Sequence, residues 1–230
     1  MSTAKNPAPH VSQLLENLQE VDLLLNIHTA LAGSSPGRKR NVEVLNKSAV
    51  VLVVACWEAY VEDLASTALK FMIDDAKSHS IFPKLVLDRV GSKYSGQHAW
   101  ALAGDGWKKA LRDNFSEVLA KTTGALNTPR APQVDELFAK TIGLPSLSAC
   151  WSWPGRPQAS AVKALDDLIT LRGSIAHRVQ HSKSVHKKSV TAAVELVSRL
   201  AAKSTNAVRQ HVHTATGKFP WNRITFKGLG

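Results

Sequence analysis

The chain has 230 residues, of which 44% are apolar and 20% are charged, as in an ordinary folded globular protein. These values exclude a miniprotein that depends on disulfides and argue against a disordered or fibrous chain. The longest uninterrupted apolar run, residues 49–57, has nine residues, whereas a helix that spans a bilayer needs about 20. The N-terminus lacks the pattern of a secretory signal, and there are two cysteines, Cys56 and Cys150. We therefore expect a cytoplasmic protein without a membrane partner, a disulfide framework or a structural metal site.

The positive charge is concentrated at the C-terminal end. Residues 172–230 hold 11 Lys or Arg and one acidic residue, a net charge of +10, whereas residues 1–171 hold 18 basic and 17 acidic residues, a net charge of +1. Such a field attracts polyanions, because each phosphate that it neutralises releases condensed counterions. Nucleic acid is the first partner class to consider. The alternatives are a solvated basic face and a patch that meets an acidic partner protein.

Two long helices are predicted at the start of the chain. Apolar residues recur at spacings of three and four across residues 10–32, and Gly33 ends this pattern. The next helix, residues 42–73, is apolar nearly all round in its first half and is therefore predicted to be the central, buried helix. Its second half carries Glu58 and Glu62 one turn apart. We interpret them as solvated or Arg-paired carboxylates, since no metal or acid-base motif accompanies them.

Residues 74–155 predict short helices inserted into a simpler bundle. Helical patterns cover residues 83–90, 107–121 and 133–142, and Gly- and Pro-containing breaks separate them. Trp151 and Trp153 follow in the segment CWSWPGRP. We interpret both as packed against the bundle, with base stacking as the alternative.

Two further helices complete the predicted fold, over residues 160–179 and 187–216, and a short tail, residues 217–230, follows. Strand-like alternation is nearly absent, and no linker or repeat is visible. The sequence thus predicts a single all-α domain over residues 1–230, a bundle of four to five principal helices.

One segment, LRGSIAHRV at residues 171–179, carries the residues best suited to chemistry. Arg172 lies on the apolar stripe of its helix, and because burying an unpaired Arg is costly, such a residue usually lines a cleft or an interface. His177 follows five residues later, about 140° around an ideal helix. The two side chains converge on one ligand only if Gly173 or the helix end distorts the backbone, or if a second subunit completes the site. The alternative is that Arg172 pairs with Glu58 or Glu62 and His177 is a core histidine.

The segment LRGSIAHRV resembles the signature of the HEPN superfamily, an Arg followed after four to six residues by a His. Three further segments are similar to the RiboL-PSP-type branch of that superfamily: WEAYVEDLA at 57–65, GLPSLSACWSW at 143–153 and TGKFPW at 216–221. The similarity extends from about Val42 to Trp221. HEPN domains are all-helical, often dimerise and cleave RNA without a metal ion.

This resemblance implies a metal-independent endoribonuclease whose active-site residues are Arg172 and His177. It also implies RNA as the substrate, no cofactor, a homodimer with a shared active site, and a role as a toxin or phage-defence effector with an antitoxin or regulatory protein. Charge and proximity alone suggest which residues hold the flanking phosphates: Arg178, Lys183, Lys187 and Lys188.

One position departs from the pattern of the resembling family. Many active relatives have Asn or Asp directly after the arginine, whereas this chain has Gly173. A non-catalytic helical module that binds RNA or a protein therefore stays open as the alternative function.

Overall fold

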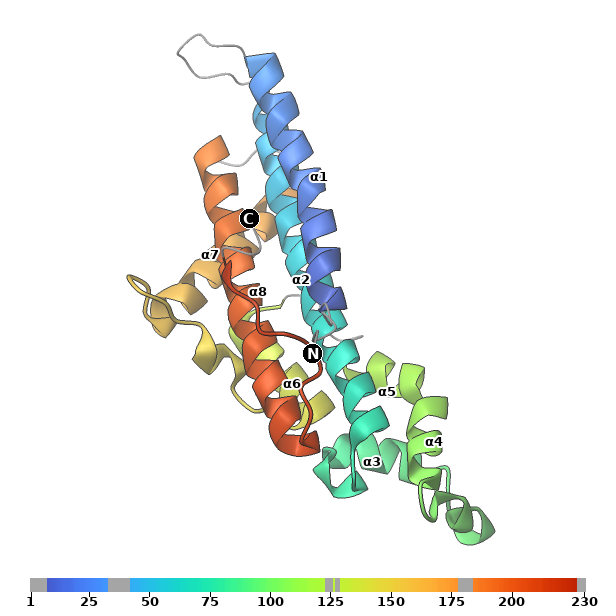
Figure 1. Ribbon diagram of the computed structural model, residues 1–230. Helices are drawn as coiled ribbons and strands as arrows, with labels where there is room; N and C mark the ends of the chain where they lie inside the picture. Colours follow the sequence, from blue (N-terminus) through green and yellow to red (C-terminus); the bar gives the residue numbers. More distant parts are fainter. Residues whose placement is uncertain (1–7, 33–41, 123–125, 127–128, 178–183, 227–230) are drawn as a thin grey trace.

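The computed structural model describes residues 8–32, 42–122, 126, 129–177 and 184–226, which form an all-α fold (Figure 1). The predicted fold class is confirmed. The frame consists of four long helices, each within two residues of its predicted bounds: α1 (Pro9–Ala32), α2 (Glu43–Asp75), α7 (Gln158–His177) and α8 (Lys187–Thr216). In Figure 1, α1 and α2 run side by side, and α8 lies along the same bundle.

The apolar stripe predicted for α1 is the face that the helix buries. Five of its six members are at most 7% exposed, namely Val11, Leu14, Leu18, Val21 and Leu25, and the sixth, Leu15, is half-buried and packs against the core. They pack mainly against α2, because side chains three and four positions apart lie on one side of a helix. The same periodicity that identifies α1 in the sequence therefore attaches it to the bundle.

The core of the bundle is α2, as predicted. It contacts α1, α6 (Ala131–Ile142), α7 and α8, so it needs apolar side chains on more than one side. By length and composition alone α2 would suffice to cross a membrane, but half of that apolar window is buried inside this fold. This is the position of a central helix in a helical bundle.

The segment between the long helices forms several short helices, as predicted, at the lower end of α2 and along α8 in Figure 1. Besides α6, these are η2 (His79–Ile81), α3 (Lys84–Gly91), η3 (Gly96–Leu102), α4 (Gly106–Asp113), α5 (Phe115–Thr122) and η4 (Leu147–Cys150).

The prediction of one helix over residues 107–121 is wrong, because α4 and α5 are separated at Asn114. The Asn114 side chain donates a hydrogen bond to the carbonyl of Ala110 (2.8 Å), and its backbone (φ −107°, ψ 12°) leaves the helical region. Asn side chains compete with helical backbone hydrogen bonds in this way. The spacing of apolar residues gives no information about such side-chain hydrogen bonds, which explains why the break at Asn114 was not predicted.

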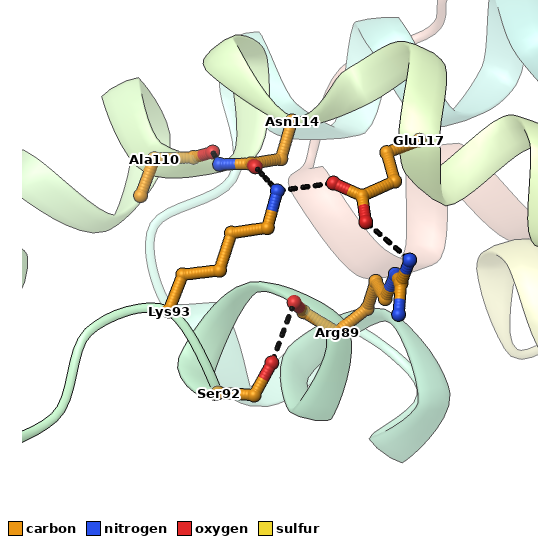
Figure 2. A network of polar contacts seen from close by, with 6 residues as sticks. All are labelled: Arg89, Ser92, Lys93, Ala110, Asn114 and Glu117. Atoms are coloured by element: carbon orange, nitrogen blue, oxygen red, sulfur yellow. Dashed lines mark hydrogen bonds and ion pairs between the residues drawn. The ribbon is translucent and has the colours of Figure 1, made fainter.

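A network of polar contacts joins α3 to α4 and α5 (Figure 2). Arg89 and Lys93 both pair with the carboxylate of Glu117, and Lys93 Nζ also donates to Asn114 Oδ1 (2.6 Å). The hydrogen bond from Lys93 lowers the pKa of Glu117. The residue that breaks the helix thus also takes part in holding α3 against α4 and α5.

A buried polar cluster connects both ends of the chain to α2. Tyr60 donates its hydroxyl hydrogen to the carbonyl of Ala201 (2.8 Å) and lies 2.8 Å from Thr205 Oγ1, which is hydrogen-bonded to His10 Nε2 (3.3 Å). The His10 ring also meets the edge of Trp221, with ring centroids 4.6 Å apart. The beginning of α1 and the C-terminal tail are therefore anchored at one point of the core.

We expect His10 to make the stability of the protein depend on pH. Burial lowers the pKa of His10 from 6.5 to about 3, so between these pH values the unfolded chain binds one more proton than the folded chain. The free energy of unfolding should therefore fall as the pH falls from 6.5 towards 3, by up to about 1.4 kcal/mol per pH unit from this residue. Urea unfolding of wild type and His10→Gln across this range measures the difference in slope.

The control is His98→Gln, which removes an exposed histidine outside the buried cluster and should change the slope less than His10→Gln does. Equal slopes in wild type and His10→Gln would contradict the assignment of a neutral, buried His10.

Candidate active site on α7

The inward placement predicted for Arg172 is confirmed. Arg172 is half-buried in the last turns of α7, beyond the part of the helix that faces the core. The residues of that core-facing part are Ala161, Leu165, Leu168 and Ile169. The helix stripe thus carries a guanidinium to the edge of the core, where a charged group needs a partner.

The surroundings of Arg172 leave part of its guanidinium without a partner. Its Nε is buried and has no hydrogen-bond acceptor among the described residues. Glu58 of α2 feels the Arg172 charge, which lowers the pKa of that carboxyl, but burial acts more strongly and the net shift is upward. In the described part of the chain no ion pair joins Arg172 to an acidic side chain. The structure therefore does not support the alternative in which Glu58 or Glu62 pairs directly with Arg172.

Three half-buried carboxylates lie on the adjoining part of α2. Burial raises the pKa of Glu58, Glu62 and Asp63, and the neighbouring charges of Glu58 and Asp63 raise that of Glu62 further. Glu58 and Glu62 keep part of their surface in contact with water, as the solvated interpretation expects, and no ion pair joins either of them to Arg172 among the described residues. Sequence reasoning missed Asp63, which lies next to Glu62 and shares its partly buried environment.

His177 is the last residue of α7, and its side chain lies outside the described part of the structure. Arg178 and Lys183 also lie outside the described residues. Lys187 and Lys188 are the first two residues of α8 and both are exposed. Of the predicted site residues, the structure thus places Arg172 and the backbone of His177 in the last turns of α7 and Lys187 and Lys188 at the start of α8.

The start of α8 is held against the first two helices. Lys187 Nζ donates a hydrogen bond to Thr29 Oγ1 (2.7 Å). Just before it, the backbone N–H of Val185 donates to Glu43 Oε1 (3.1 Å) and the Val185 carbonyl accepts from Asn46 Nδ2 (3.0 Å). These contacts fix where the basic segment rejoins the bundle.

The sequence model of the RiboL-PSP-HEPN family matches residues 13–208, which is most of the chain. The chain belongs to the RiboL-PSP-HEPN family. The match begins within α1, includes both Arg172 and His177, and ends within α8, before the C-terminal tail. No curated protein and no solved structure matches this chain at a significant level.

In this RiboL-PSP-HEPN chain, Gly173 does not distort α7. The helix is continuous from Gln158 to His177, and Gly173 does not adopt a positive φ. A Cβ atom at Gly173 would meet no other atom within 4 Å, so packing does not require glycine here. No local kink at Gly173 therefore brings positions 172 and 177 onto one face of α7.

The described residues of this RiboL-PSP-HEPN chain contain no group of three His, Cys, Asp or Glu side chains placed to hold a metal ion. Both cysteines are free, with Cys56 buried in the core and Cys150 half-buried. Burial raises the pKa of Cys56 to about 11 and that of Cys150 to about 12, so both thiols stay protonated at neutral pH.

Proposed function

We propose that this RiboL-PSP-HEPN chain is a metal-independent endoribonuclease that acts in the cytoplasm and that Arg172 and His177 form its active site. The observation that carries the proposal is the Arg172 guanidinium, whose buried Nε has no partner among the described residues. Leaving such a group unsatisfied is costly unless a ligand completes its hydrogen bonds. A phosphate oxygen of RNA suits it, because Arg binds phosphate through charge-assisted hydrogen bonds.

The reaction that fits these residues is attack by a ribose 2'-OH on the adjacent phosphorus. The bond between the 2' oxygen and phosphorus forms while the bond from phosphorus to the 5' oxygen breaks, which leaves a 2',3'-cyclic phosphate and a 5'-OH. The 2'-OH loses a proton and the departing 5' oxygen gains one. His177 transfers the proton at one of these two oxygens and solvent water at the other, since imidazole titrates near neutral pH. Arg172 stabilises the negative charge that builds up on the non-bridging oxygens.

The charge distribution supports an RNA substrate. Residues 172–230 carry a net charge of +10, and Lys187 and Lys188 are exposed at the start of α8. In this proposal, Lys187, Lys188, Arg178 and Lys183 hold phosphates on either side of the cleaved bond. The cellular role that we propose is that of a toxin or phage-defence effector restrained by a regulatory protein.

We further propose a homodimer with a shared active site. Because α7 is continuous, positions 172 and 177 lie about 140° apart around the helix axis, and in this proposal a second subunit completes the site. The second half of α1 supplies an apolar surface for such contact, since Leu23 (53%), Ile27 (40%) and Leu31 (67%) are exposed at a spacing of four residues.

We expect Ile27→Glu combined with Leu31→Glu to convert a dimer into a monomer, because the contact would then bury two carboxylates. Light scattering coupled to size exclusion measures the mass, and Trp100→Glu, which changes a residue 83% exposed on η3, is the control. A wild-type protein that is monomeric throughout the concentration range would contradict the proposed dimer.

The proposed reaction is tested by incubating the protein with RNA and with DNA of the same sequence, both in EDTA. We expect cleavage of RNA only, with 2',3'-cyclic phosphate and 5'-OH ends, because DNA lacks the attacking 2'-OH. Cleavage that disappears in EDTA, or that equals the background of His177→Ala, would contradict the proposal.

One observation favours a second candidate function, a module that binds RNA without cutting it. Gly173 stands where many active HEPN relatives have a polar residue, and the structure leaves room for a side chain there. This candidate predicts salt-sensitive RNA binding that His177→Ala does not affect, together with no cyclic-phosphate product.

A further inference from the structure

A pocket of about 440 Å³ lies between α8, the segment that follows η4, and the C-terminal tail. Its volume is within the range of small-molecule sites. No residue of α7 is among those that line it, so it is separate from the candidate active site. The side chains that give it chemical character are Cys150, Trp153, Arg199, Lys203, Arg223 and Phe226.

Specific hydrogen bonds hold the tail in place as one wall of this pocket. The Asn206 side chain pairs with the backbone of Ile224 in both directions, donating to its carbonyl (2.8 Å) and accepting from its N–H (3.1 Å). Arg209 Nε donates to the carbonyl of Trp221 (2.7 Å), and the Trp221 ring is 2% exposed. The pocket is therefore a built feature of the fold and not a gap beneath a loose terminus.

The pocket is positively charged and contains no acidic side chain among its described lining residues. Arg199 is neutralised from outside by Glu195 (Nε to Oε1, 2.8 Å). Lys203 and Arg223 form no ion pair within the described part of the chain. Burial and the nearby Arg223 charge lower the pKa of Arg209. Two cations without counterions thus face a common space, which favours an anionic ligand.

Beside these cations the pocket is lined by planar side chains, and Arg199 lies against both aromatic rings. The Arg199 guanidinium carbon lies 4.0 Å from the ring centroid of Phe226 and 5.5 Å from that of Trp153. Aromatic rings and guanidinium planes are the surfaces on which nucleobases stack. The thiol of Cys150 adds an uncharged wall, since burial raises its pKa to about 12.

We propose that this pocket binds a nucleotide, with Lys203 and Arg223 holding its phosphate and the wall of Trp153, Arg199 and Phe226 receiving its base. An inorganic anion would pair with the two cations but would not stack on the planar side chains. An uncharged aromatic compound would stack but would not pair with the cations. A free nucleotide and a nucleotide within an RNA strand both present an anionic phosphate and a base, so the experiment separates these two sources.

The test uses the full chain carrying His177→Ala, so that RNA is not degraded and the outcome does not depend on the proposed cleavage. The pocket variant is the double variant Lys203→Gln and Arg223→Gln. The control variant is the double variant Lys140→Gln and Lys163→Gln, which changes two exposed lysines that each pair with an acidic residue one turn away. Calorimetry measures the binding of AMP, ribose 5-phosphate and a single-stranded RNA decamer. Melting curves verify that every variant is folded.

We expect the pocket variant to bind AMP about 10- to 100-fold more weakly than the control variant, because it loses two charge-assisted contacts. Ribose 5-phosphate should bind at least about 10-fold more weakly than AMP, since it cannot stack. A second outcome is that AMP does not bind, whereas the pocket variant binds the decamer about 10- to 100-fold more weakly than the control variant does. If a 4-thiouridine decamer then crosslinks to a peptide containing Trp153 or Phe226, the ligand is a nucleotide within an RNA strand. Equal affinities of the pocket and control variants for both AMP and the decamer would overturn the proposal, as would binding of ribose 5-phosphate as tight as that of AMP.

Discussion

Replacing His177 with alanine is expected to lower the rate of RNA cleavage by about 10²- to 10⁴-fold, the usual contribution of a general acid or base. Arg172→Ala should lower it by about 10²- to 10³-fold, because the charge on the transition state loses one positioned donor. Single-turnover assays with a labelled RNA in EDTA measure the chemical step directly. The double variant should be only slightly slower than the worse single variant, since groups that act on one transition state are not additive.

The matched control for this experiment is His186→Ala. His186 is an exposed histidine in the same basic part of the chain, directly before α8, so it matches the change in residue type and the local charge. We expect it to cleave RNA at the wild-type rate. A loss of activity shared equally by His177→Ala and His186→Ala would indicate a general effect on RNA binding and would contradict a catalytic role for His177.

The second large effect is expected in the core, where Trp57→Ala should lower the free energy of unfolding by about 3–5 kcal/mol. Trp57 is fully buried on α2, stacks on Tyr60 with ring centroids 5.6 Å apart, and meets Trp151 edge-on at 5.8 Å. Its Nε1 donates to the carbonyl of Pro129 (2.9 Å). The substitution removes the ring from two aromatic contacts and leaves a buried carbonyl without its donor.

Urea unfolding followed by circular dichroism measures this effect, and Trp100→Ala is the matched control. Trp100 is 83% exposed, so its replacement should change the free energy of unfolding by less than about 0.5 kcal/mol. Trp57→Phe should fall between the two, because it keeps an aromatic ring and loses the hydrogen bond. Equal effects of Trp57→Ala and Trp100→Ala would show that Trp57 is not the packing centre described above.

The tryptophans also mark the limit of prediction from local pattern. Trp151 is fully buried and donates from Nε1 to Ser204 Oγ (2.8 Å), which confirms that it packs against the bundle. Trp153, two residues later, is half-buried and lies beside Arg156 and Arg199. The sequence presents the two residues as a similar pair, but Trp151 is enclosed in the core whereas Trp153 packs against it from a half-buried position. The tail divides in the same way, since Trp221 is buried whereas Phe219 is 44% exposed and stacks on His213.

The long helices and the inward position of Arg172 could be predicted because both depend on residues close together in the chain. The spacing of Leu14, Leu18 and Val21 defines one face of α1, and the burial of that face follows directly. The excess charge after residue 172 is likewise a property of the sequence alone. None of these features requires knowledge of which helices are neighbours.

Three features could not be predicted from residues close together in the chain. They are the unpartnered Arg172 Nε, the half-buried carboxylates of α2, and the pocket of Arg199, Lys203 and Arg223. Each depends on segments distant in the chain, such as α7 against α2, or the tail against α8. Hydrophobic periodicity states which face of a helix is buried, but it does not state what that face meets. The packing of the helices determines which segments are in contact. It therefore also determines which charges and hydrogen-bond partners surround each polar side chain.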